Sequence, residues 1–263
     1  MKIRVAGLVF AAFVLGGCVT GRRVMPLPVT TQAVPAATRG TVYIASITDD
    51  RQFQNKPSDP SIPSVDGDVS KLSAHLRDQM IGRQRNAFGK AMGDIALPAG
   101  DSVTERVRLL VQEAFRRSGY SVTKDPSAAN SVDVSVMEFW SWMTPGFAAL
   151  TFEAKLTCRI FDHSGDPSRF ILVKGYGRNY GQFAKDVNWQ EAYDPAFQDF
   201  ITNFVGQVAA LGLGHENGTD HAAAGAAVTD VADEIRKLDQ LRRSGAITNE
   251  EFETQKRRLL ERQ

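Results

Sequence analysis

The segment at residues 150–162, LTFEAKLTCRIFD, constrains the fold of this chain more than any other. Apolar side chains such as Phe152 and Ile160 alternate along it with charged ones such as Glu153 and Arg159. A period of two places the apolar residues on one side of an extended chain. This pattern is typical of a strand half buried in an antiparallel sheet, so we expect such a sheet.

Further segments predict the partners of this strand. Strands are expected from β-branched and aromatic residues at 40–47, 120–122, 131–142 and 169–180. Residues 48–68 are rich in Pro, Asp and Ser and predict an irregular connection, with a short helix within 69–82.

Two long helices are also expected. The first covers 103–118, where Ser102 and Glu105 have the S-x-x-E spacing of a capping box with two reciprocal hydrogen bonds. The second should begin near Asp194, with Pro195 at its first position. The sequence therefore predicts an α+β domain: a mostly antiparallel sheet of four to five strands packed with two long helices, followed by a C-terminal helical hairpin.

The N-terminus predicts export from the cytoplasm. Lys2 and Arg4 precede an apolar run at residues 5–14, and small residues follow. This is the pattern of a secretory signal peptide, and the run is shorter than the roughly 20 residues that span a bilayer.

The stretch LGGC at residues 15–18 resembles the lipobox of bacterial lipoproteins. The resemblance implies that Cys18 becomes the first mature residue and carries several acyl chains, enough for stable anchoring. It further implies an outer-membrane location facing the periplasm, because Val19 rather than Asp follows the cysteine. An ordinary signal peptide with an incidental cysteine is the alternative.

The sequence divides into five segments. These are a signal peptide (1–17), a Pro- and Thr-rich tether (18–39), the α+β domain (40–213), a linker of small residues (214–227) and the helical hairpin (228–263).

Composition argues against a nucleic-acid partner. Cleavage of the signal peptide removes Lys2 and Arg4, so 29 of the 31 Lys and Arg residues remain beside 30 Asp and Glu residues. A near-neutral chain has no overall basic field. Cys158 has no second cysteine to pair with once Cys18 carries lipid, and it lies on the apolar side of its strand, as an inert core thiol would.

The C-terminal tail resembles the short C-terminal (SHOCT) domain family. Its matching residues are Leu238, Leu241, Gly245, Ile247, Thr248, Glu250, Glu251, Phe252 and Lys256. The resemblance implies a small interaction or oligomerisation unit without catalysis. A hairpin this short buries little surface alone, so we expect Leu238, Leu241, Ile247, Phe252 and Leu259 to contact a second copy or an envelope protein.

The main domain more loosely resembles YajG-like and related small bacterial lipoproteins. The shared features are the lipobox, a strand, a helix ending in RRSGYSV, antiparallel strands and a closing helix. The long insertion at 51–101 departs from shorter members of that family, and the resemblance implies a fold rather than an activity.

The stretch IGRQRNAFGKAMG at residues 81–93 could cradle a phosphate, but its spacing does not fit the G-x-x-x-x-G-K-[ST] motif. We favour an ordered surface loop whose glycines permit tight turns. The alternative is a docking loop in which Arg83, Arg85, Phe88 and Lys90 contact a partner or anion.

The sequence offers only a weak case for catalytic residues. Asp49, Asp50 and Arg51 are more typical of a solvated turn, and the histidines lack metal-ligand spacing. The aromatic residues could bind a sugar or peptide but more often pack in a core, and they are Trp140, Trp142, Phe147, Trp189, Tyr176 and Tyr180.

The sequence therefore predicts a non-enzymatic envelope lipoprotein without a cofactor, with a scaffolding, assembly or partner-binding role. Two alternatives remain. One is an envelope hydrolase, which would need Asp49, Asp50 and Glu138 in one cleft. The other is a carrier of lipid or another apolar ligand, which would need an internal cavity of several hundred cubic ångströms between sheet and helices.

Overall fold

The structure is a computed structural model that describes residues 21–37, 39–86, 88–163, 165 and 170–213. The predicted signal peptide, Cys18, the C-terminal linker and the helical hairpin lie outside these residues.

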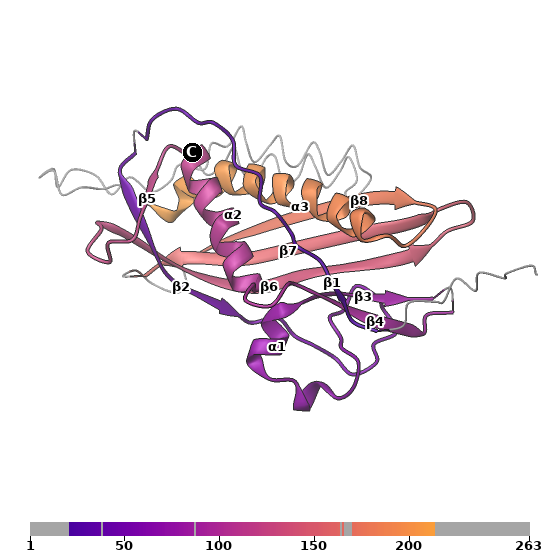
Figure 1. The fold of residues 1–263 in the computed structure, drawn as a ribbon. Coiled ribbons are helices and arrows are strands. Elements are labelled where there is room, and N and C mark those ends of the chain that lie inside the picture. The colour runs from indigo at the N-terminus through magenta and orange to yellow at the C-terminus, as the bar shows by residue number, and fades with distance from the viewer. Residues whose placement is uncertain (1–20, 38, 87, 164, 166–169, 214–263) are drawn as a thin grey trace, which may run out of the picture. The chain divides into compact units, whose positions relative to one another are not determined.

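The described residues form eight strands and three α-helices (Figure 1). The strands are β1 (Arg23–Val24), β2 (Thr41–Asp49), β3 (Met80–Arg85), β4 (Ala91–Ala96), β5 (Ser121–Thr123), β6 (Asn130–Pro145), β7 (Leu150–Asp162) and β8 (Phe170–Gly181). The helices are α1 (Ala74–Gln79), α2 (Val103–Arg117) and α3 (Asp186–Gln207), and short 3-10 turns lie at Val69–Lys71 and Val208–Leu211.

The α+β class is confirmed, but the predicted sheet of four to five mostly antiparallel strands is wrong. Six strands follow the order β1-β4-β3-β6-β2-β5, and every pairing along this path except β3–β4 is parallel. Strands β7 and β8 extend from β6 in antiparallel pairing. The antiparallel neighbours expected for 150–162 are therefore confirmed, because β7 is antiparallel to both β6 and β8. The error lies in the pairings of β1, β2, β3 and β5, where a local pattern does not report the direction of the neighbouring strand. Helix α2 lies between β4 and β5 in the chain, and such a crossover is what allows β5 to run parallel to β2.

Helix α2 forms where the sequence predicts it, but only half of its capping box is present. The Ser102 hydroxyl accepts a hydrogen bond from the Glu105 backbone N–H at 3.1 Å. The Glu105 carboxylate instead faces Arg108 at 3.6 Å.

Helix α3 begins at Asp186 rather than near Asp194, so Pro195 lies inside it. Trp189 and Tyr193 are fully buried and extend the apolar stripe of the helix toward its N-terminus. Burial of these two large rings favours helix before the proline, although proline cannot donate a backbone hydrogen bond there.

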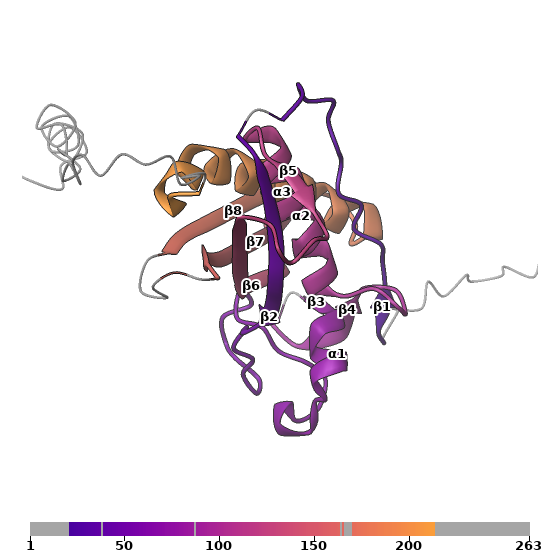
Figure 2. The same cartoon turned by 90° about the vertical axis from the view of Figure 1, so that its left-hand side faces the viewer.

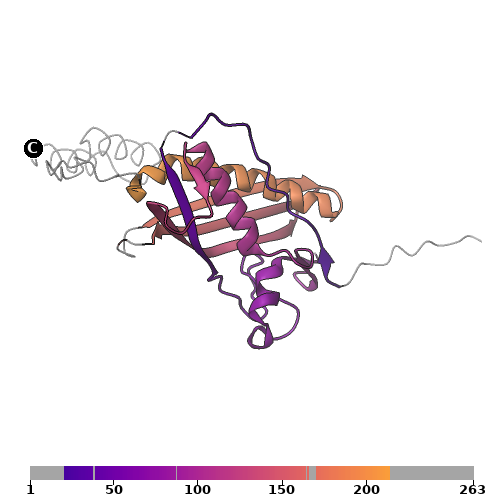
Figure 3. The same ribbon diagram turned by 60° about the vertical axis from the view of Figure 1, so that its left-hand side comes forward.

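Helices α2 and α3 lie side by side and cover one face of the sheet (Figures 2 and 3). Phe115 of α2 and Phe204 of α3 meet edge to face, with ring centroids 4.8 Å apart. On the opposite face of the sheet, a smaller apolar cluster is formed by Val65, Met80, Ala96, Trp140 and Trp142.

Part of the predicted tether belongs to this domain. Arg23 and Val24 form β1, and the side chains of Met25 and Leu27 are each only 1% exposed in the main core. The folded unit therefore includes chain that composition assigned to an extended spacer.

Candidate functional site

Residues 81–93 form most of the β3–β4 hairpin. The side-chain oxygen of Asn86 accepts hydrogen bonds from the N–H groups of Phe88 and Lys90 at 3.0 and 2.9 Å. Gly89 adopts a φ of +76°, which glycine tolerates best. These N–H groups bond within the turn, whereas a phosphate-binding loop turns them toward its ligand.

The Arg83 side chain is buried behind this hairpin. It donates to the Val65 carbonyl, and its guanidinium lies 3.6 Å from Asp94 and 3.3 Å from Asp66. Burial raises the pKa of Asp94, whereas the Asp66 backbone N–H and the charge of Arg83 act against this rise. Arg83 therefore stabilises the fold and is not exposed as a docking residue would be.

Other residues of the predicted docking loop do reach the surface. Phe88 is 94% exposed, Lys90 is exposed, and Arg85 donates to the Pro57 carbonyl at 2.9 Å. Lys56 joins these residues around an open cleft of about 590 Å³. The hairpin thus presents cations and one exposed aromatic ring together.

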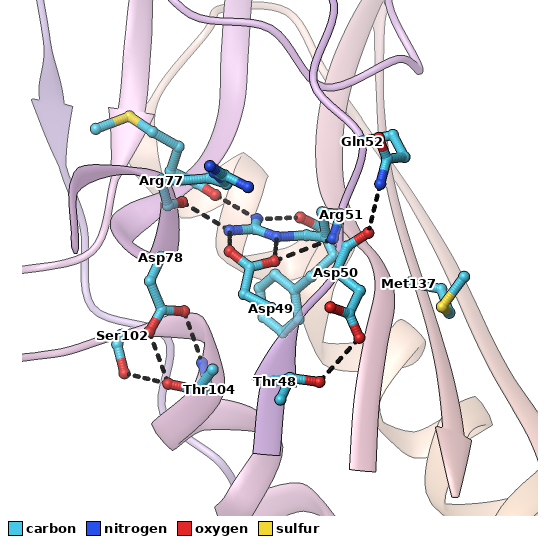
Figure 4. A network of polar contacts seen from close by, with 12 residues as sticks. Thr48, Asp49, Asp50, Arg51, Gln52, Arg77, Asp78, Ser102, Thr104 and Met137 are labelled. Atoms are coloured by element: carbon cyan, nitrogen blue, oxygen red, sulfur yellow. Dashed lines mark hydrogen bonds and ion pairs between the residues drawn. The ribbon is translucent and has the colours of Figure 1, made fainter. Parts of the chain in front are cut away.

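At the candidate acidic turn, Asp50 is exposed as expected, but Arg51 is a buried structural junction rather than a solvated residue. Arg51 is 1% exposed, and all five of its N–H donors are used (Figure 4). Two bonds go to the Asp49 carboxylate at 2.7 and 2.8 Å, and the other three go to the carbonyls of Arg77, Met80 and Phe139. A guanidinium with no free donor has none left for a substrate.

The three carboxylates that a hydrolase would need have separate partners. Asp49 binds Arg51, and Asp50 accepts from the hydroxyls of Thr48 and Ser135. Burial alone would raise the pKa of Glu138, but bonds from Lys155 and Thr157 outweigh it and lower this pKa. A general acid at neutral pH needs a raised pKa, so Glu138 does not fit that role.

The aromatic residues do not form one patch. Trp140 and Trp189 are fully buried and Trp142 is 9% exposed, whereas Phe147 is fully exposed in the β6–β7 turn. Tyr176 is half exposed on β8 and donates to Glu153. Cys158 is fully buried, as the sequence predicts, and this burial raises the pKa of its thiol.

A second surface was not singled out by the sequence. It is an open cleft of about 470 Å³ on the sheet face away from the helices, lined by residues that include Met137, Glu138, Lys155, Leu172 and Lys174. The alternation along β7 and β8 predicts which side of the sheet each side chain lies on. Only the register of β6, β7 and β8 brings these residues together.

Within the described residues, no cluster of three or more His, Cys, Asp or Glu side chains is arranged to hold a metal ion. Among the helices that the structure describes, none is long and apolar enough to cross a membrane.

The chain carries a C-terminal SHOCT domain, because residues 233–260 match the family model of the short C-terminal domain. This confirms the predicted resemblance. The matched range includes Leu238, Leu241, Ile247, Phe252 and Leu259, which lie outside the described residues. No curated protein matches the chain in sequence.

Several solved structures resemble the fold at low identity. A Xanthomonas campestris protein of family DUF330 is 12% identical, with a TM-score of 0.43, over 72% of this chain and 96% of that one. Lipoprotein GNA1162 from Neisseria meningitidis is 11% identical, with a TM-score of 0.21, over 66% of this chain and 99% of that one. Likeness at this level assigns neither an activity nor a partner.

Proposed function

We propose that this chain is a lipid-anchored lipoprotein of the cell envelope with a non-catalytic scaffolding or partner-binding role. Acylated Cys18 holds it in the membrane, and Val19 favours the outer membrane, facing the periplasm. The observation that carries the non-catalytic part is the Arg51 junction, where all five Arg51 donors and the Asp49 carboxylate are bonded within the fold.

The SHOCT domain supplies self-association or docking to an envelope partner in this proposal. Deletion of residues 228–263 should lower the oligomer mass measured by light scattering on the purified chain. An unchanged mass removes self-association and leaves docking to another protein. Mass spectrometry of the natural N-terminus tests the anchor, since an unmodified Met1 would contradict it.

No specific observation favours the two alternatives. The carrier would need a cavity between sheet and helices, whereas the two clefts described above, of about 590 and 470 Å³, are open to solvent. The hydrolase would need Asp49, Asp50 and Glu138 to converge, whereas these three carboxylates bind separate partners.

A further inference from the structure

The N-terminal segment is fixed to the domain from Gly21 onward. The Gly21 N–H donates to the Met92 carbonyl at 3.2 Å, and β1 continues this pairing in parallel along β4. Because β4 starts at the turn of the β3–β4 hairpin, the chain traced backward from β1 heads toward that turn. The first described residue, Gly21, therefore lies beside the hairpin.

The distance from the anchor to the domain is short. Cys18 precedes Gly21 by three residues, and three extended residues span at most about 11 Å. A lipid on Cys18 thus holds this end of the domain close to the bilayer, whereas a free tether to residue 39 would not.

Three loops meet at this same end. Strand β3 is parallel to β6, with Gly82 opposite Ser141, and β8 runs with β6 because both are antiparallel to β7. The turns after β3 and β6 and the loop after β8 therefore lie at one end of the sheet, as Figure 1 shows for the three strand ends. The guanidinium of Arg23 in β1 also donates to the Ala184 carbonyl in the loop after β8, at 2.8 Å.

Each of these loops presents one exposed phenylalanine. Phe88, Phe147 and Phe183 are 94%, 109% and 68% exposed, the highest values among large apolar residues in the described part of the chain. A single exposed apolar residue is ordinary, but three gathered around the anchored terminus indicate a contact surface.

The charges at this end favour a negatively charged surface. Lys90, Lys185 and Arg22 are exposed. The Asp186 carboxylate is 3.1 Å from Arg23, so its charge is paired. Cations near the phosphates of anionic lipids are attracted to them over roughly a Debye length.

We propose that this end of the domain, the anchor face (Phe88, Phe147, Phe183, Lys90 and Lys185), lies on the bilayer and inserts its three rings between lipid headgroups. The inference rests on the lipid anchor of the proposed function and adds a fixed orientation to it. Aromatic rings favour the membrane interface, and the lysines remain at the lipid phosphates.

Tryptophan fluorescence on vesicles tests this orientation. Three variants of the full-length lipidated protein are made, Phe88→Trp, Phe147→Trp and Phe183→Trp. Each is placed in vesicles of phosphatidylethanolamine and phosphatidylglycerol, with or without bromine on the acyl chains. Emission from each added tryptophan should shift to the blue and be lost on brominated lipid. The native Trp140, Trp142 and Trp189 are buried and give a constant background.

Phe170→Trp is the matched control. Phe170 is 46% exposed and begins β8, at the end away from the anchor face, so its emission should be unaffected by bromine. If mass spectrometry shows that Cys18 is acylated but emission from the three anchor-face variants is neither shifted nor quenched, the orientation is wrong while the proposed function stands. An unacylated Cys18 overturns the proposed function as well. A blue shift that appears only when envelope proteins are added, and that brominated lipid does not quench, assigns the face to a protein partner. That result overturns the lipid proposal.

Discussion

At the scale of single residues, Arg51 holds together three parts of the chain. Its loss would leave the Asp49 carboxylate and three backbone carbonyls without their partner. We expect Arg51→Met to lower the free energy of unfolding by about 3–5 kcal/mol, as is typical for one broken partner of a buried ion pair. Urea denaturation measures this, and Arg39→Met at an exposed position should stay within about 0.5 kcal/mol. Equal effects of the two substitutions would contradict the structural role.

Glu113 gives stability a pH dependence. Burial alone would raise its pKa, but hydrogen bonds from Arg117 and the Gln32 N–H, with the charge of Arg116, outweigh it and hold the pKa below 4.5. The folded state therefore favours the carboxylate. Its contribution is present above pH 4.5 and is lost as the pH falls through the lower folded-state pKa.

The Glu113→Gln variant should accordingly be less stable than the natural chain at pH 7, and the difference should shrink as the pH falls below about 4.5. Urea denaturation across this pH series measures the difference. A gap that stays constant with pH would show that Glu113 contributes through packing alone.

At the scale of elements, the contact between α3 and β8 depends on glycine. A Cβ on Gly177 would lie 2.2 Å from the Ala192 carbonyl oxygen, and one on Gly175 would lie 2.3 Å from that of Ala196. We expect Gly177→Ala to destabilise the domain by about 1–3 kcal/mol because helix and strand must separate. The control is Gly206→Ala near the end of α3, where an added Cβ would meet no atom beyond its chain neighbours and its own helix backbone within 4 Å, and a small stabilisation is expected. Thermal unfolding compares the two, and similar stabilities would refute this close-packing argument.

Helix α3 also covers the edge of β8, which pairs only with β7 among the described strands. The Tyr176 N–H donates to Asp199 and the Lys174 carbonyl accepts from Asn203, both at 2.9 Å. Bonded edge groups are not free to pair with another chain. This edge is therefore a poor docking site for another strand.

At the scale of the whole folded domain, the segment at residues 21–27 is held against the sheet through β1 and its pairing with β4. A Cβ on Gly93 would lie 1.9 Å from the Gly21 carbonyl oxygen. Gly93→Ala should therefore displace β1 and speed amide hydrogen exchange at residues 21–27. Exchange in α2 serves as the internal control and should be unchanged. Unaltered exchange at 21–27 would mean that the segment does not depend on this close approach.

Local patterns in the sequence predicted several particular elements. The alternation at 150–162 predicted the faces of β7, and the N-cap pattern at Ser102 predicted the start of α2. The start of α3 was missed because Pro195 is a strong local signal, whereas the burial of Trp189 and Tyr193 depends on the sheet beneath them. Arg83 was expected at the surface because isolated charge patterns do not reveal Asp94 across the hairpin.

The sequence by itself determined the α+β class, the SHOCT domain and the periodic faces of the longest elements, because these depend on residues close together in the chain. The tertiary structure alone decided the parallel pairings, the burial of Arg51 and Arg83, and the gathering of Phe88, Phe147 and Phe183 at one end. Strand direction and register join residues that are far apart in the chain, and no local period encodes which distant segment will be the neighbour.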